Sequence, residues 1–253
     1  MSVLKTAVIG VGWIGTSHAR ILSENDRVKL KAVCDTDLDR ARKIADRYNI
    51  NYYQDYNEMF QKEDLDAVII STPPETHKKI AIDAINQNLN ILLEKPIATT
   101  IEDAQKIAET AINKGIKIMV GHTERFNPAV RKLKELLEEN KLGKIYKIDI
   151  RRVGPFPERI SDVGVVIDLA VHDIDVINYL FSPKIANVYA ETMKMLHPKH
   201  EDLLTAIIRF DNGVQAVLNI NWLTPYKTRK LSIIGEKGNL MVNYLTQEVI
   251  FQE

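Results

Sequence analysis

The chain has 253 residues, 45% hydrophobic and 27% charged, which is enough to bury a substantial core in one large or two smaller domains. Basic and acidic side chains balance at 34 each, so no overall charge draws the protein to nucleic acid or to an anionic membrane. Cys34 is the only cysteine, which excludes an intramolecular disulfide and a thiolate zinc cluster. Together with an N-terminus that has neither a signal-like cleavage region nor a long apolar span, this predicts a soluble cytoplasmic protein.

The first half of the chain alternates short apolar runs with amphipathic segments. The runs LKTAVIG, VKLKAVCD, DAVIIST, NILLEKP and IKIMVGH are typical of strands, and helical patterns separate them. The segment IEDAQKIAETAINKG has apolar residues at helical spacing, begins after Thr99 and Thr100 as candidate caps, and ends at Gly115. This alternation predicts a parallel sheet with crossover helices.

The second half is dominated by strands. Asn127 and Pro128 begin one amphipathic helix, and a second helix is expected from about Val165 to Phe181. The remaining apolar runs are strand-like, and Asp211-Asn212-Gly213 predicts a hairpin between two of them. We therefore predict an α/β protein with a first domain built on a parallel sheet over residues 1–122, followed by an α+β domain with a large, mainly antiparallel open sheet over residues 123–253.

A glycine motif follows the first predicted strand and opens the first predicted helix. Gly10, Gly12 and Gly15 fit the spacing G-x-G-x-x-G, in which the glycines form the turn, let a pyrophosphate approach the backbone and pack helix on strand. Trp13 and Ile14 lie inside the motif. Asp35 follows at the end of the second strand, where a carboxylate can bind a ribose hydroxyl and would repel a 2′-phosphate, so NAD is expected rather than NADP. The alternative for Asp35 is a helix N-cap. The motif and Asp35 together predict that residues 1–122 form a Rossmann dinucleotide-binding domain.

Polar residues follow the fourth and fifth predicted strands, in STPPETH and LLEKPIA. Ligands of open α/β sheets bind beyond the carboxyl ends of the strands. Lys95 could donate to a substrate oxygen and Glu94 could bind a cofactor ribose, although an exposed ion pair explains both residues equally well. On the second-domain helix, Asp168 and His172 are four residues apart and so share a face, with Asp175 close to it.

These helical residues suit acid–base chemistry, because the histidine can accept a proton near neutral pH and an aspartate can orient it. Helical metal ligands are the other interpretation, but the cluster lacks a third well-spaced partner. The stretch HPKHED at 197–202 could also hold a metal, and we expect it to be a solvated turn instead. No metal is predicted.

Six features of the chain are specific when their order and spacing are taken together: GVGWIG, Asp35, STPPETH, LLEKP, GHTERFNP and DLAVHDID. Over nearly the whole chain, this pattern resembles the Gfo/Idh/MocA family of nicotinamide-dependent sugar and polyol oxidoreductases. The resemblance implies that Lys95, Asp168 and His172 surround the reacting carbon. It implies hydride transfer from a sugar carbinol carbon to the nicotinamide, with His172 taking the hydroxyl proton and Lys95 stabilising negative charge. It further implies that Thr72, Pro73, His77 and Glu94 form the wall of the nicotinamide half, and that Ser71 and Lys95 also bind the cofactor.

For the substrate, the stretch from Arg151 to Asp175 resembles family members that oxidise C3 of a UDP-N-acetylhexosamine, and Arg152 and Arg159 could bind diphosphate oxygens. His122 and Arg125 are expected near the substrate, although Arg125 could instead pin the RFNP turn. Two features depart from the family: members usually run some tens of residues longer, and DLAVH has no glycine before its histidine.

Exposed apolar strand faces predict a homodimer or homotetramer. Two other functions stay open at this stage. One is an NAD-dependent glycosidase of the same fold, and the other is a non-catalytic sensor of the dinucleotide.

Overall fold

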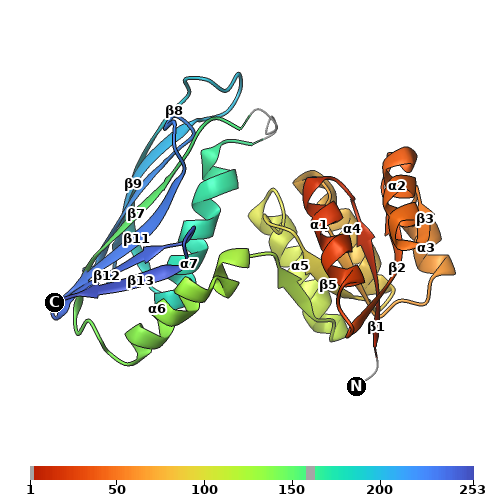
Figure 1. Ribbon diagram of the computed structural model, residues 1–253, viewed down its shortest axis with the longest axis horizontal. Coiled ribbons are helices and arrows are strands. Elements are labelled where there is room, and N and C mark those ends of the chain that lie inside the picture. Colours follow the sequence, from red (N-terminus) through yellow and green to blue (C-terminus); the bar gives the residue numbers. More distant parts are fainter. Residues whose placement is uncertain (1–2, 158–162) are drawn as a thin grey trace. The chain divides into compact units, whose positions relative to one another are not determined.

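The computed structural model describes residues 3–157 and 163–253. The chain forms two compact units, Met1–Gly121 and His122–Glu253, so the first unit ends one residue before the boundary predicted from the sequence. Figure 1 labels the elements of each unit. No helix within the described ranges is long and apolar enough to cross a membrane.

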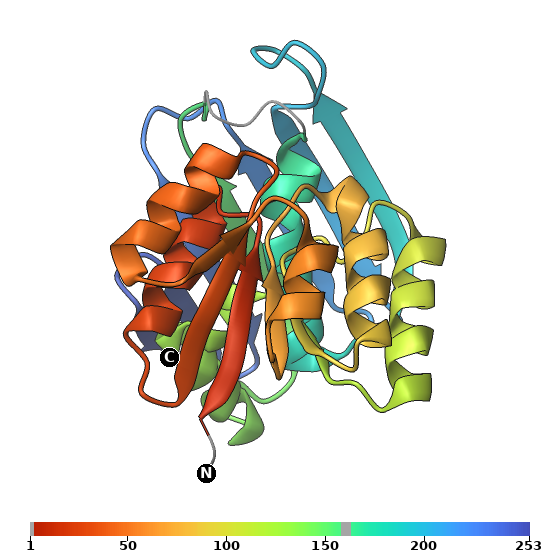
Figure 2. The same cartoon turned by 90° about the vertical axis from the view of Figure 1, so that its right-hand side faces the viewer.

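The first unit is a parallel sheet of six strands in the order β3-β2-β1-β4-β5-β6. Figure 2 shows β1 and β2, red and orange, side by side. The strands are β1 (Leu4–Ile9), β2 (Val28–Cys34), β3 (Asn51–Tyr53), β4 (Ala67–Ile70), β5 (Asn90–Leu93) and β6 (Ile118–Val120). The helices are α1 (Trp13–Ser23), α2 (Leu38–Tyr48), α3 (Tyr56–Lys62), α4 (Pro74–Asn86) and α5 (Ile101–Lys114).

Side chains of the parallel strands alternate between two apolar layers. On β1, Val8 packs with residues of α1 and α2, whereas Ala7 and Ile9 pack with residues of α3, α4 and α5. The sheet is therefore covered on both faces, as crossover connections require. The predicted caps are confirmed for α5, where the Thr100 side chain accepts from the Asp103 N–H and Gly115 ends the helix with φ +66°.

The second unit is a sheet of seven strands in the order β13-β12-β11-β7-β10-β9-β8. Its neighbours are antiparallel except for β7 and β10. The strands are β7 (Ile145–Val153), β8 (Ile185–Met193), β9 (Leu203–Phe210), β10 (Gln215–Asn221), β11 (Thr228–Gly235), β12 (Gly238–Asn243) and β13 (Glu248–Gln252). The predicted hairpin joins β9 to β10, with Gly213 at φ +85°.

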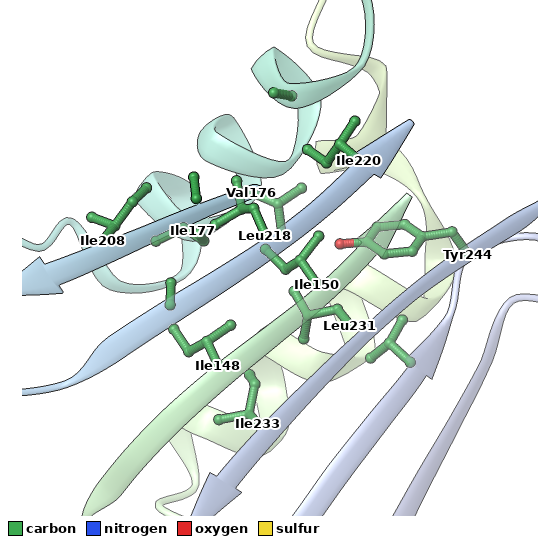
Figure 3. Packing of buried hydrophobic residues seen from close by; sticks show 14 of the residues in the cluster. Ile148, Ile150, Val176, Ile177, Ile208, Leu218, Ile220, Leu231, Ile233 and Tyr244 are labelled. Atoms are coloured by element: carbon green, nitrogen blue, oxygen red, sulfur yellow. The ribbon is translucent and has the colours of Figure 1, made fainter. Parts of the chain in front are cut away.

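The helices α6 (Pro128–Glu138) and α7 (Val171–Phe181) share one apolar core with this sheet. Figure 3 shows Ile148, Ile150 and Leu218 of the sheet together with Val176 and Ile177 of α7 in that core. Alternate residues of β9 are buried, whereas all nine residues of β8, at the sheet edge, are exposed. The core thus covers one face of the sheet and fixes the position of α7.

The helix expected from Val165 to Phe181 differs in its first turn. Residues Val166–Ala170 form a π-helical turn (η2), and regular α-helix begins only at Val171. A second short element, the 3₁₀-helix η1 (Thr123–Phe126), precedes Asn127, whose side chain caps α6 by accepting from the Ala129 N–H. Isolated π-turns inside helices are frequent at functional sites, and this one contains Asp168.

Candidate active site

The glycine motif forms a turn that only small residues fit. Gly10 has φ +81°, and a Cβ atom there would lie 2.8 Å from the Ser71 carbonyl oxygen. A Cβ atom on Gly15 would lie 1.8 Å from the Gly10 carbonyl oxygen, so α1 rests directly on the turn. At Gly12 a Cβ atom would meet nothing within 4 Å, which leaves the backbone open on that side.

The open side of Gly12 suits a pyrophosphate. Gly12 is the N-cap residue of α1 and has no side chain that could accept a hydrogen bond from the N–H groups of the first helical turn. A helix N-terminus that presents such groups binds anions. Trp13 and Ile14 begin the helix and are 74% and 44% exposed, so they offer apolar surface beside this anion site. The turn therefore fits the diphosphate of a dinucleotide.

Asp35 follows β2 and is tied to the same turn. Its carboxylate accepts from the Val11 N–H at 2.8 Å and from the Asp37 N–H at 2.9 Å. The N-cap of α2 is Asp37, whose side chain accepts from the Arg40 N–H. The N-cap role that was the alternative for Asp35 is therefore taken by Asp37. The Arg40 guanidinium lies 3.3 Å from Asp35 Oδ2, so a cationic group that the sequence did not single out lies beside this carboxylate.

Ser71, Thr72 and Pro73 follow β4, the strand next to β1 in the sheet. The Ser71 hydroxyl donates to the Gly10 carbonyl at 2.7 Å, and Thr72 Oγ1 lies 2.7 Å from Thr76 Oγ1. Pro73 precedes the first residue of α4 and takes its N-cap position. These residues therefore lie at the carboxyl edge of the sheet with the glycine turn, as predicted.

His77, expected in the cofactor wall, is fully buried instead. Its Nδ1 lies 2.9 Å from the Pro96 carbonyl oxygen and its Nε2 lies 2.9 Å from the Thr72 carbonyl oxygen. With 0% exposure and both nitrogens directed at backbone oxygens, the ring has no atom available to a cofactor. The structure therefore corrects this prediction, and His77 links two loops.

Glu94 and Lys95 directly follow β5. Oε1 of Glu94 lies 2.8 Å from His18 Nε2 on α1, and the Lys95 N–H donates to Oε2 at 3.3 Å. Beneath this carboxylate, a Cβ atom on Gly121 would lie only 3.0 Å from Oε2. Glu94 is thus held in place, and Lys95 lies half-buried at the same sheet edge as the glycine turn.

In the second unit, Asp168 lies in the π-turn and His172 in the first turn of α7, and both are half-buried. Arg229 on β11 is close enough to Asp168 for this carboxylate to be one of the acidic groups that favour its charged guanidinium. Burial, followed by the charge of Arg152, nevertheless lowers the pKa of Arg229 below its ordinary value. The helix start therefore combines a carboxylate and an imidazole with a cationic group nearby.

Arg152, predicted to bind substrate, lies instead in a buried charge cluster formed by Glu124, Arg152, Asp173, Arg229 and Tyr244. It is 1% exposed, and its Nε donates to Asp173 at 2.6 Å while Nη1 and Nη2 donate to Glu124 at 3.0 Å. Burial lowers the pKa of Arg152, but the negative charges of Asp173 and Glu124 outweigh it and raise that pKa above its ordinary value. The guanidinium is committed to these carboxylates, which corrects the prediction.

Arg125 and His122 converge on Asp175, which is 8% exposed. The Arg125 Nε donates to Asp175 at 2.9 Å and its Nη2 at 2.5 Å, a bidentate pair, and His122 Nδ1 lies 3.6 Å from the same carboxylate. Arg125 thus takes the pinning role considered as its alternative, and it joins η1 to α7. The remaining substrate candidate, Arg159, lies outside the described residues.

The stretch at 197–202 is a solvated turn only in part, because Pro198 and Lys199 are exposed whereas His197 and Asp202 are buried. Asp202 is fully buried and accepts from the N–H groups of Met195, Leu196 and His197, bonds that lower its pKa although burial alone would raise it. Among the residues that the structure describes, no group of three metal-ligating side chains could hold an ion. Burial, then the charge of Asp35, raises the pKa of Cys34 to about 12, so its thiol is not a nucleophile.

The buried charge cluster yields a stability prediction. Replacing Arg152 with Met should destabilise the second unit by about 3–5 kcal/mol, because two buried carboxylates lose their counter-charge. Arg151, exposed on the opposite face of the same strand, is the matched control, and Arg151→Met should cost less than about 0.5 kcal/mol. Urea unfolding followed by fluorescence of the buried Trp222 measures both. Equal effects for the two variants would contradict this account of the cluster.

Comparison with known proteins agrees with this geometry. Residues 4–122 match the "Oxidoreductase family, NAD-binding Rossmann fold", and residues 130–241 match the "GFO/IDH/MocA C-terminal domain". The inositol 2-dehydrogenase of Salmonella typhimurium is 29% identical over 93% of this chain and 72% of its own length. The UDP-N-acetylglucosamine 3-dehydrogenase of Acidithiobacillus ferrooxidans is 27% identical over 96% of this chain and 74% of its own.

A crystal structure of the latter enzyme superposes with a TM-score of 0.90 at 26% identity, covering 99% of this chain and 80% of that one. The likeness therefore extends over both units. The glycine turn, Asp35 and the segment after β5 occupy the half that matches the NAD-binding model. The chain belongs to the Gfo/Idh/MocA oxidoreductase family, and its first unit is the NAD-binding Rossmann domain of that family.

Proposed function

We propose that the protein is a dehydrogenase that oxidises a secondary alcohol on a cyclic polyol or sugar, using NAD. The observation that carries this proposal is the position of Lys95, on the segment that leaves β5 at the carboxyl edge of the parallel sheet. The glycine turn after β1 and the Ser71–Pro73 segment after β4 lie along the same edge, on adjacent strands. A cationic donor is thus placed on the edge where the nicotinamide half of NAD would be held.

When bound, NAD supplies the acceptor for the hydride that leaves the carbinol carbon. His172 takes the proton from the hydroxyl group, and the Lys95 ammonium donates a hydrogen bond to the same oxygen as negative charge develops there. The alcohol becomes a ketone and the imidazole carries the proton away. Asp168 lies one turn before His172, in the π-helical segment, and orients the imidazole.

A polyol or simple sugar is the substrate class that we favour. Of the two arginines predicted to bind a diphosphate, Arg152 has its guanidinium bonded to Asp173 and Glu124. The relatives act on both kinds of substrate by name, an inositol in one case and a UDP-N-acetylhexosamine in the other. Assaying NADH formation with myo-inositol and with UDP-N-acetylglucosamine separates the two.

The catalytic assignment predicts that Lys95→Ala and His172→Ala each lower kcat by about 10²–10⁴-fold, because each removes a group that acts on the reacting oxygen. The dissociation constant of NADH, measured by fluorescence, should change less than about threefold. Lys106→Ala, on the exposed face of α5, is the control and should leave kcat unchanged. Undiminished turnover in both variants would refute the assignment. Glycoside cleavage without net NADH formation would favour the glycosidase instead.

The cofactor preference predicts that Asp35→Asn weakens NADH binding about 10-fold or more and strengthens NADPH binding by a similar factor. The carboxylate that bonds a ribose hydroxyl is lost, and Arg40 remains beside the position to meet a 2′-phosphate. Isothermal titration with both reduced cofactors measures this. Asp39→Asn, one residue from Arg40 on the exposed part of α2, is the control. An unchanged ratio of the two affinities would show that Asp35 does not select the cofactor.

We further propose that the protein is a homodimer or homotetramer. Every residue of the edge strand β8 is exposed, and its apolar members include Val188, Tyr189 and Met193, each more than half exposed. Exposed apolar strands of this length invite association. Size-exclusion chromatography with light scattering should therefore give at least twice the chain mass of 28.8 kDa. A monomer at micromolar concentration would contradict the proposal, and Tyr189→Glu should shift an oligomer toward the monomer.

A further inference from the structure

We propose that His18 and His77 are a pair of positioning residues that fix the segment Glu94-Lys95-Pro96 from two different helices, and through it the Lys95 ammonium. The proposal rests on the function proposed above for Lys95. Neither histidine contacts the reacting atoms in this account. One holds the residue before the lysine, and the other holds the residue after it.

His18 acts on the Glu94 side. It lies on α1, the helix that begins at the glycine turn, and its Nε2 is 2.8 Å from Glu94 Oε1. The two side chains are 19% and 14% exposed, so water competes little for this contact. The other carboxylate oxygen accepts from the Lys95 N–H, and the Gly121 backbone lies so close that a Cβ atom there would be 3.0 Å from this oxygen. The Glu94 side chain thus connects α1 to the Lys95 backbone.

His77 acts on the Pro96 side. It lies on α4 with no exposed surface, and its two ring nitrogens face the carbonyl oxygens of Pro96 and Thr72, both at 2.9 Å. A neutral imidazole donates from only one nitrogen, so its tautomer decides which carbonyl receives the hydrogen bond. In either tautomer the ring occupies the space between the loops that follow β4 and β5. A buried carbonyl oxygen that lost this donor would be costly to leave unpaired.

The two contacts matter because the lysine side chain is long. Four methylene carbons separate its ammonium from the backbone, so any shift or rotation of the segment is carried to the charged end. A misplacement of about 1 Å in a catalytic group can cost about 100-fold in rate. Holding the backbone on both sides of Lys95 limits that misplacement without placing any further group at the reacting oxygen.

Two amide variants at position 77 separate the contacts of the two ring nitrogens. The side-chain nitrogen of Asn takes the place of Nδ1, so His77→Asn retains a donor for the Pro96 carbonyl. The nitrogen of Gln reaches the place of Nε2, so His77→Gln retains a donor for the Thr72 carbonyl only. We expect His77→Asn to stay within about threefold of the unchanged enzyme in kcat, and His77→Gln to fall about 10-fold or more, the effect of about 1.4 kcal/mol.

His18 provides an independent pair that serves if His77→Gln does not fold. His18→Gln keeps a donor near the Nε2 position, whereas His18→Leu removes it, so only the leucine variant should lose kcat by about 10-fold. In all four variants the NADH dissociation constant should change less than about threefold. A loss confined to kcat distinguishes misplacement of the lysine from general damage to the NAD-binding domain.

Hydrogen exchange of the free protein gives a readout that needs no turnover. Amides of the peptide spanning residues 93–98 should exchange faster in His77→Gln and His18→Leu than in His77→Asn and His18→Gln. In a Lys95→Ala background the kcat difference within each pair should disappear, because the lysine through which the histidines act is gone.

The outcomes separate this proposal from the function on which it rests. Full turnover of Lys95→Ala would overturn the proposed function, whatever the histidine variants do. With a strong Lys95→Ala effect in place, equal kcat and equal exchange within both pairs would overturn the positioning proposal. Losses that persist undiminished when combined with Lys95→Ala would overturn it as well.

Discussion

The contact between Gly15 and Gly10 is the constraint on which the first unit depends. Because neither residue carries a side chain, α1 approaches so closely that a single methyl group on Gly15 would lie 1.8 Å from the Gly10 carbonyl oxygen. That approach brings the start of α1 to the strand ends of the sheet. It places the helix N-terminus where a diphosphate can meet it and places His18, one turn further on, against Glu94. Binding of the cofactor and placement of the lysine segment thus follow from one close packing contact.

Much of this edge could be predicted from the sequence because its signals are local. Each signal spans only a few residues: the spaced glycines, the strand that ends before Asp35, and the strand that ends before Glu94-Lys95-Pro96. Parallel strands then bring these ends to one edge of the sheet. The caps of α5 and α6 were readable for the same reason. The family resemblance added the expected roles of the residues. Sequence position alone did not decide whether Glu94 and Lys95 form an ion pair or whether Lys95 is catalytic.

The errors concern partners that are distant in the sequence. Arg152 was predicted to bind substrate because a guanidinium suits diphosphate oxygens, yet its carboxylate partners are 21 and 28 residues away in the sequence. His77 lies on an ordinary amphipathic helix, and nothing local reveals that both ring nitrogens face carbonyl oxygens of two loops. The π-turn that contains Asp168 has no sequence pattern of its own, since apolar spacing over five residues does not separate it from α-helix.

The two units fix their candidate catalytic residues by different physical means. In the first, neutral and charge-assisted hydrogen bonds hold a loop, Glu94-Lys95-Pro96, whose backbone would otherwise be mobile. In the second unit, ion pairs hold the regular helix α7. Apolar packing alone would let this helix rotate about its axis or slide along the sheet at little cost in free energy. Arg152 on β7 bonds Asp173 on α7. Arg125 in η1 bonds Asp175, which lies about half a turn further along the same helix.

These two ion pairs lie on the same helix as His172 and carry directional bonds that apolar contacts lack. Their desolvation cost means that they add little net stability compared with well-packed apolar residues. What they supply is an angular restraint on α7, because turning the helix would separate both carboxylates from their guanidinium partners. The orientation of α7, which carries His172, is therefore restrained by charged groups outside the proposed catalytic set.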